Sequence, residues 1–167
     1  MIKERLYIFD TTLRDGAQTQ GVDFSLDDKE KIALALDNLG VDYIEAGWPG
    51  ANPTDTEFFQ KKHNFKNSKL TSFGMTKKTG RSVENDPGLS AIMNSNTSSV
   101  CLVGKAWDFH VDVALGIKNE ENLENISEST KHFVKTNKEF MFDAEHFFDG
   151  YKANPKYAVE CIKAAYD

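Results

Sequence analysis

Charged side chains that could bind an anion, hold a metal ion or move a proton follow several short apolar runs in this sequence. Arg14 and Asp15 follow the first run, Glu45 ends the second, and Asp143 and Glu145 end the last. A guanidinium can hold a carboxylate or a developing oxyanion, whereas a carboxylate can ligate a divalent cation or act as a general base. These residue types therefore suit metal, acid–base or anion-binding chemistry.

Each of these residues also has a plain structural interpretation. Asp15 precedes a glycine and could belong to a tight turn, and Arg14 could be a surface arginine paired with Asp15 beside it. Glu145 could be a solvated residue at the rim of a strand end. His110 and His146 are possible bases, but single histidines beside aromatic residues are more often structural. Residue type alone leaves both interpretations open.

The elements that must position these side chains alternate between strand and helix along the whole chain. Short β-rich runs predict five strands, and amphipathic stretches that follow cap residues or prolines predict five helices. No hairpin signal separates two strands, so the pattern predicts parallel pairing with right-handed crossovers. We expect strands at residues 6–9, 41–46, 70–75, 98–103 and 139–143, and helices at residues 26–39, 53–65, 89–93, 120–136 and 155–166.

Five βα units in 167 residues fit two α/β architectures. Each unit takes about 33 residues, so a closed (β/α)8 barrel of ~250 residues would need three more units. A doubly wound open sheet of the flavodoxin type could stop at five units, and length alone favours it. In either architecture the active site lies at the carboxyl ends of the strands, where the acids, bases and glycines gather. Residues 1–167 contain no linker, so one domain is expected.

Composition narrows the class of protein. The chain has 20 lysines and arginines against 26 aspartates and glutamates, and its net charge of −6 argues against a nucleic-acid-binding surface. No segment approaches the roughly 18 apolar residues of a membrane span, and the first apolar run is too short for a signal peptide. Two cysteines, Cys101 and Cys161, imply no disulfide framework. We expect a cytoplasmic protein without nucleic-acid or membrane partners.

Four strand-end segments resemble the motifs of one enzyme family. Residues 9–18, Phe-Asp-Thr-Thr-Leu-Arg-Asp-Gly-Ala-Gln, resemble the opening signature of the DRE-TIM metallolyases. That family includes the isopropylmalate, homocitrate and citramalate synthases and the related aldol-cleaving lyases. Residues 44–49 resemble its second-strand motif, and residues 104–111 and 142–155 are similar to the citramalate synthase branch. The resemblance extends over essentially the whole chain.

The resemblance implies a (β/α)8 barrel that joins acetyl-CoA to a 2-oxo acid in a Claisen condensation. For the citramalate branch the acceptor is pyruvate, and this acyltransferase serves isoleucine biosynthesis. The implied cofactor is a divalent cation, Mn, Mg or Zn. The implied partners are the small-molecule substrates and, in the full-length protein, a second copy in a homodimer. On this interpretation the chain is an α/β partial TIM barrel with about five of eight βα units.

The functional residues of the family match positions at these strand ends. Asp15 matches the metal-ligand aspartate, while Arg14 and Glu145 match the catalytic arginine and glutamate. Lys77 stands in a loop where relatives tend to carry an arginine, so an anion-binding role is open there. The expected substrate-binding residues are Arg14, Gln18, Glu45 and Asp143.

One part of the family's site is missing from this sequence. The family completes its metal site with two histidines spaced His-x-His on a later strand. No pair among His63, His110, His132 and His146 has this spacing. We therefore expect residues 1–167 to be the N-terminal part of the catalytic barrel, without its later strands or a regulatory region, and to be inactive alone.

Two alternatives to a citramalate synthase remain open at this point. Within the family, the acceptor could belong to 2-isopropylmalate or homocitrate synthesis, or the reaction could be the aldol cleavage of a lyase. From another class, a self-contained flavodoxin-like module could bind a ligand without catalysis.

Overall fold

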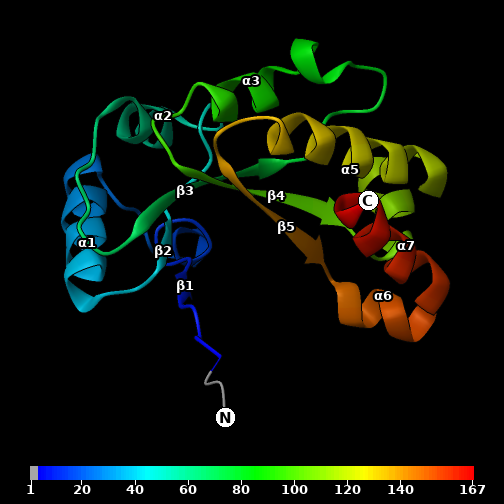
Figure 1. Ribbon diagram of the computed structural model, residues 1–167, viewed down its shortest axis with the longest axis horizontal. Coiled ribbons are helices and arrows are strands. Elements are labelled where there is room, and N and C mark those ends of the chain that lie inside the picture. Colours follow the sequence, from blue (N-terminus) through cyan, green and yellow to red (C-terminus); the bar gives the residue numbers. More distant parts are fainter. Residues whose placement is uncertain (1–3) are drawn as a thin grey trace.

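Five parallel strands form the centre of the molecule in the computed structural model, which describes residues 4–167. Each strand pairs in parallel with the next one along the chain. The sheet curls into a half-barrel, with helices ranged along its outer side (Figure 1). The strands are β1 (Phe9–Asp10), β2 (Tyr43–Glu45), β3 (Lys69–Met75), β4 (Ser99–Lys105) and β5 (Glu139–Glu145).

The unbroken strand order decides between the two architectures that the sequence allowed. In a doubly wound sheet the order reverses at a switch point, and helices then cover both faces. Here the order is β1-β2-β3-β4-β5 without reversal, as in a singly wound barrel. The open flavodoxin-type sheet that length alone favours is therefore wrong, and the partial barrel is confirmed.

Local capping signals set the starts of the main helices. α1 (Leu26–Leu39) begins with a capping box between Ser25 and Asp28 and ends at Gly40, whose φ of 89° favours glycine. Proline opens α2 (Pro53–Gln60), α3 (Pro87–Met93) and α7 (Pro155–Tyr166), whereas α5 (Asn119–Val134) starts without one.

None of the helices in the described part of the chain combines the length and apolar character needed to cross a bilayer.

Several boundaries differ from the predicted ones. α2 ends at Gln60 rather than near residue 65, because the His63 ring stacks on the Phe58 ring with centroids 4.2 Å apart. The Nε2 atom of His63 also lies 2.8 Å from the Phe58 carbonyl oxygen, which satisfies the end of the helix. Two further short elements are not among the predicted helices. They are α4 (Asp108–His110), continued by the π-helical η3 (Val111–Leu115), and α6 (Phe147–Ala153).

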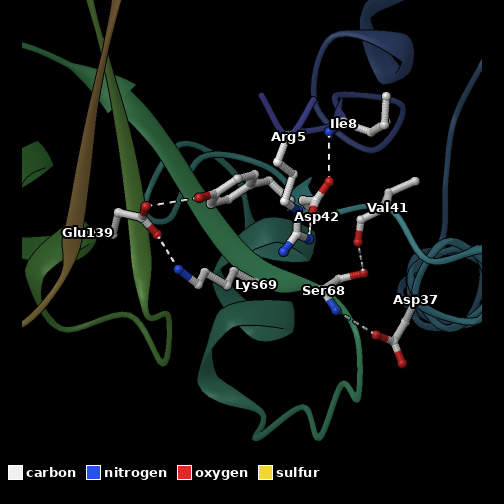
Figure 2. Close-up of polar contacts among 9 residues, drawn as sticks. Arg5, Ile8, Asp37, Val41, Asp42, Ser68, Lys69 and Glu139 are labelled. Carbon is white, nitrogen blue, oxygen red and sulfur yellow. Dashed lines mark hydrogen bonds and ion pairs between the residues drawn. The ribbon is translucent and has the colours of Figure 1, made fainter. Parts of the chain in front are cut away.

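Strand β1 is shorter than the predicted run of residues 6–9. The Ile8 N–H donates to the side chain of Asp42 at 2.9 Å, so a carboxylate takes the place of a strand partner (Figure 2). The Ile8 carbonyl still accepts from the N–H groups of residues 42 and 43, both at 3.0 Å. Pairing with β2 is regular only at Phe9 and Asp10.

Alternation along the strands separates the apolar core from the polar residues. Val100 and Leu102 of β4 pack outward against α3 and α5, and Phe142 of β5 packs toward α7. Successive side chains of a strand point to opposite faces, so the residues between them face the concave side. These inward residues are Ser99, Cys101, Val103 and Lys105 on β4, and Glu139, Met141, Asp143 and Glu145 on β5.

Glu139 connects three strands at the amino-terminal end of the sheet (Figure 2). Its carboxylate accepts from the Tyr43 hydroxyl at 2.9 Å and from the Lys69 ammonium at 2.7 Å. The Lys69 ammonium lowers the pKa of Glu139. A residue of β5 thus reaches side chains of β2 and β3 across the concave face, and the contacts stabilise the curl of the sheet.

Asp37 fixes the loop that leads into β3. Its carboxylate is 1% exposed and accepts hydrogen bonds from the backbone N–H groups of residues 66–68 at 2.8–3.0 Å; Figure 2 shows the contact with Ser68. Burial by itself raises the pKa of Asp37, but the three N–H donors outweigh burial, and the net pKa is lowered. The ionised side chain is therefore the form that holds this loop.

We predict that Asp37→Ala lowers the free energy of unfolding by about 3 kcal/mol, because three backbone N–H donors lose the buried carboxylate that accepts from them. Urea unfolding at pH 7, followed by circular dichroism, measures the loss. The matched control is Asp27→Ala, which removes an exposed ion pair with Lys31 and should change stability by less than about 0.5 kcal/mol.

The pH dependence of Asp37→Ala has a defined sign. A carboxyl whose pKa is lowered in the folded state stabilises it above the unfolded pKa of 3.8, and this stabilisation is lost as pH falls through the folded pKa. The gap between wild type and variant should therefore narrow in acid. A loss below about 1 kcal/mol at pH 7 would contradict the role assigned to this carboxylate.

Candidate active site

The segment after β1 places Arg14 and Asp15 at the carboxyl end of the sheet. The N–H groups of residues 14–16 all donate to the Thr11 carbonyl oxygen, at 2.9–3.1 Å, and this tight turn leads into η1 (Gly16–Gln18). Asp10 reinforces the turn by accepting from the Thr12 N–H at 3.0 Å. Because backbone hydrogen bonds close the turn, the side chains of Arg14 and Asp15 are available to the cavity beside it.

Three neighbours hold the Arg14 guanidinium. Its Nε lies 2.6 Å from Oε2 of Glu45, and its Nη1 lies 3.4 Å from Oδ1 of Asp15. Its Cζ lies 3.9 Å from the centroid of the Phe73 ring, which adds a cation–π contact. The guanidinium is thus fixed on the Glu45 and Phe73 sides and presents its remaining N–H groups to the cavity.

Glu45 lies beneath Arg14 and is 1% exposed. Burial raises the pKa of Glu45, the Arg14 guanidinium opposes that rise, and the charge of Asp143 adds to it. The neighbouring Cys101 is also buried, and burial raises the pKa of its thiol. Cys101 is therefore a buried neutral thiol beside Glu45, and Glu45 serves as the acceptor that orients Arg14.

Glu145 and Asp143 project from the end of β5 toward the same space. Glu145 forms an ion pair with Lys105 at the end of β4. Asp143 is half-buried, and burial raises its pKa, while Arg14 opposes the rise. Lys105 is not among the site residues expected from the sequence, although its alternation with Val103 along β4 is the signal that could have found it.

These groups border a cavity of about 590 Å³ at the carboxyl ends of the strands. Three cations, Arg14, Lys29 and Lys105, and four carboxylates, Asp15, Asp23, Asp55 and Glu145, are among the described residues that line it. A small anion can bind to the cations while a carboxylate stays within reach as a base. The rest of the wall mixes polar side chains (Gln18, Asn52 and Thr54) with apolar ones, among them Leu13, Trp48, Phe73, Met75 and Val103.

The structure gathers most of the expected site residues but not all of the candidates. Gln18 lines the cavity with Arg14, Asp15 and Glu145, whereas Glu45 and Asp143 are not among the described residues that line it. The rings of His110 and His146 lie 4.6 Å apart beside Trp107, outside the residues that line this cavity. Lys77 is buried, and its ammonium is 3.0 Å from Glu128 and 3.1 Å from the Arg81 carbonyl oxygen.

The residues present supply one candidate metal ligand rather than a metal site. The Asp15 carboxylate is largely exposed and touches Arg14. Among residues 4–167, no three His, Cys, Asp or Glu side chains come close enough together to hold a metal ion. One carboxylate is too few ligands for a divalent cation, so this donor set does not by itself fit the implied cofactor.

A buried ion pair supports one wall of the cavity. Lys29 of α1 is 3% exposed; it forms an ion pair with Asp55 of α2 and donates to the Ala46 carbonyl at 2.7 Å. Asp55 in turn accepts from the Trp48 N–H at 2.9 Å. A side chain at Gly47, where φ is 142°, would place its Cβ 2.5 Å from the Asp55 carboxylate. The pair therefore sets the path of the chain after β2, and sequence patterns do not indicate it.

The curled parallel sheet with a charged cavity at its carboxyl ends is the architecture of a barrel enzyme. Residues 5–167 match the HMGL-like family, and the chain belongs to that family.

Several citramalate synthases are similar to this chain over nearly its whole length. The (R)-citramalate synthase of Aquifex aeolicus is 52% identical over 164 residues, and that of Geobacter sulfurreducens is 45% identical over 162. These matches cover 97% and 96% of this chain but only 31% of each relative, so the chain spans about a third of the curated relatives it matches. Several 2-isopropylmalate synthases are less similar, at 29–36% identity.

Solved structures agree with the fold. An HMG-CoA lyase from Bacillus subtilis superposes with a TM-score of 0.76 over 98% of this chain and 55% of its own, at 15% identity. An HMG-CoA lyase from Pseudomonas aeruginosa gives a TM-score of 0.65 over 83% of this chain and 45% of its own, at 17% identity. At these identities the likeness concerns the fold alone.

We predict that Lys29→Met lowers the free energy of unfolding by about 3–5 kcal/mol, because it leaves the Asp55 carboxylate buried without its counter-charge. Urea unfolding at pH 7 provides the measurement. Lys31→Met on the same helix is the control, since Lys31 is exposed and its pairing with Asp27 is worth less than about 1 kcal/mol. If both variants had the same stability, the Lys29–Asp55 pair would not be a main support of this wall.

Proposed function

We propose that this chain supplies the first part of the catalytic barrel of an (R)-citramalate synthase-like acyltransferase, which joins acetyl-CoA to pyruvate. The observation that carries the proposal is the Arg14 guanidinium, fixed by Glu45 and Phe73 and facing the Lys105–Glu145 pair across one cavity. The higher identity to citramalate synthases than to 2-isopropylmalate synthases supports the choice of acceptor. The resemblance extends the proposal to isoleucine biosynthesis, a cytoplasmic location and a homodimer.

In the proposed reaction Arg14 binds the acceptor. Its outward N–H groups hydrogen-bond the carboxylate or the ketone oxygen of the 2-oxo acid and stabilise the alkoxide that forms there. Because Glu45 accepts a hydrogen bond from the Nε–H group, the guanidinium keeps one orientation during the reaction. Asp143 is near enough for its charge to interact with the guanidinium and adds negative charge to this site.

Glu145 is the proposed base for the acetyl group. It takes a proton from the methyl group of acetyl-CoA. The deprotonated carbon then bonds to the ketone carbon of the acceptor. Hydrolysis of the thioester afterwards releases the CoA thiol. Lys105 balances the charge of Glu145 and holds it at the edge of the cavity.

A divalent cation, when bound, would hold the 2-oxo acid and polarise its ketone. Asp15 is the proposed ligand from this chain. The other ligands would have to come from residues outside it, in line with the missing His-x-His spacing.

The acceptor preference gives a direct test. In the full-length protein, meaning a longer chain that contains residues 1–167 and the rest of the barrel, we predict thiol release from acetyl-CoA with the highest kcat/KM for pyruvate. The advantage over 2-oxoisovalerate and 2-oxoglutarate should be about tenfold or more, because the larger acids must fit additional atoms. A preference for either larger acid would replace the citramalate assignment with another synthase of the family.

Variants of Asp15 and Glu145 should separate metal binding from catalysis. In the full-length protein, Asp15→Ala should weaken Mn²⁺ binding measured by calorimetry. Glu145→Gln should leave Mn²⁺ binding unchanged and reduce kcat by roughly 10²-fold or more. Glu160→Gln, on α7 and outside the cavity, is the control and should change neither quantity. A Glu145→Gln variant within about twofold of wild-type turnover would remove Glu145 from its proposed role.

A further inference from the structure

A second cavity, of about 620 Å³, adjoins the first at the carboxyl end of the sheet. Trp48 and Met75 line both cavities and form the wall between them. On its far side the second cavity is bordered by apolar residues of the segment after α4 and by two asparagines of α5. These residues are Ala114, Leu115, Ile117, Asn122 and Asn125.

A cationic turn stands at this second cavity. The Arg81 N–H donates to the Lys78 carbonyl at 3.1 Å, and Gly80 between them has a φ of 84°, which favours glycine in such a turn. Lys78 and Arg81 are exposed and line the cavity. Neither forms an ion pair with another residue in the described part of the chain.

Buried side chains hold the turn in place. Lys77 donates to the Arg81 carbonyl at 3.1 Å, and Asp86 accepts from the Lys78 N–H at 2.9 Å. Asn125 of α5 donates to the Thr79 hydroxyl at 2.6 Å, so the loop between β3 and α3 is fastened to α5 (Figure 1). The two free cations are therefore presented from a fixed backbone rather than from a loose loop.

The charge around the second cavity differs from the charge around a third, shallower depression next to it. This depression is lined by Asp108, Asp112 and Glu120, with Lys118 as its only cation among the described lining residues. In the second cavity the one carboxylate is Asp86, which already accepts three backbone N–H groups. A ligand with several negative charges is thus attracted to the cationic turn and repelled by the acidic depression.

We propose that the turn of residues 78–81 binds the phosphate groups of the acyl donor and that the second cavity holds the arm connecting them to the thioester. This inference rests on the proposed function, because it takes coenzyme A as the donor's carrier. Acetyl-CoA is too large to share the first cavity with a 2-oxo acid, so most of it must lie elsewhere. The wall of Trp48 and Met75 places the second cavity directly beside the reacting groups.

Calorimetric titration of the full-length protein with coenzyme A and with pantetheine tests the proposal. Pantetheine has the same arm and thiol but lacks the phosphates and the adenosine. The double variant Lys78→Gln, Arg81→Gln should bind coenzyme A about tenfold more weakly or worse, since charge-assisted contacts to phosphate are lost, and should bind pantetheine as wild type does. In the thiol-release assay KM for acetyl-CoA should rise, with kcat and KM for pyruvate unchanged.

Lys66→Gln provides the matched control, because Lys66 is an exposed lysine that lines neither cavity. Equal coenzyme A affinity in wild type and double variant would overturn the phosphate assignment and leave the proposed function intact. Parallel loss of coenzyme A and pantetheine binding would overturn it as well, since the effect would then be on the cavity and not on phosphate. A wild-type protein that binds no coenzyme A would overturn both proposals.

Discussion

The contact between Arg14 and Glu45 is the interaction on which the rest of the site depends. A carboxylate that is 1% exposed loses almost all of its hydration, and only a close opposite charge with good hydrogen-bond geometry compensates for this loss. The 2.6 Å contact with Nε provides part of that compensation, and burial still raises the net pKa of Glu45. It also turns the guanidinium so that Phe73 covers one face and the outer N–H groups point to the cavity. The acid therefore orients the cation that the proposed chemistry uses.

The same rule applies to other charges near the cavity, of which one pair is buried and one is partly buried. Lys29 pairs with Asp55, and Lys105 pairs with Glu145, so positive and negative groups enter the half-barrel together. Each pair joins separate elements: α1 with α2 in the first case and β4 with β5 in the second. Removing one partner would leave a charge in a poorly hydrated place, which makes these contacts specific. The polar interior thus contributes to the shape of the cavity as well as to its charge.

The positions of the two cavities follow from the paths of the loops after β2 and β3. After β2 the chain turns at Gly47 against Asp55, and this turn puts Trp48 between the cavities. After β3 a cationic turn is fastened to α5. The charged reacting groups and the cationic turn consequently lie on opposite sides of one aromatic wall. This arrangement suits a two-substrate reaction in which a small acid and a large anionic donor must meet at one point.

The sequence by itself determined the features that depend on neighbouring residues. Ser25 and Gly40 mark the ends of α1, and alternation on β5 puts Asp143 and Glu145 on one face, because caps and side-chain direction are set within a few residues. Arg14, Asp15 and Glu145 also stand out in the sequence, since each belongs to a motif that is contiguous along the chain. Tertiary structure alone decided the strand order, the early end of α2 under His63, the pairing of Lys105 with Glu145 over 40 residues, and the second cavity. These features depend on how strongly the sheet curls and on which side chains, far apart in the sequence, then come into contact. A local sequence pattern does not determine such long-range contacts.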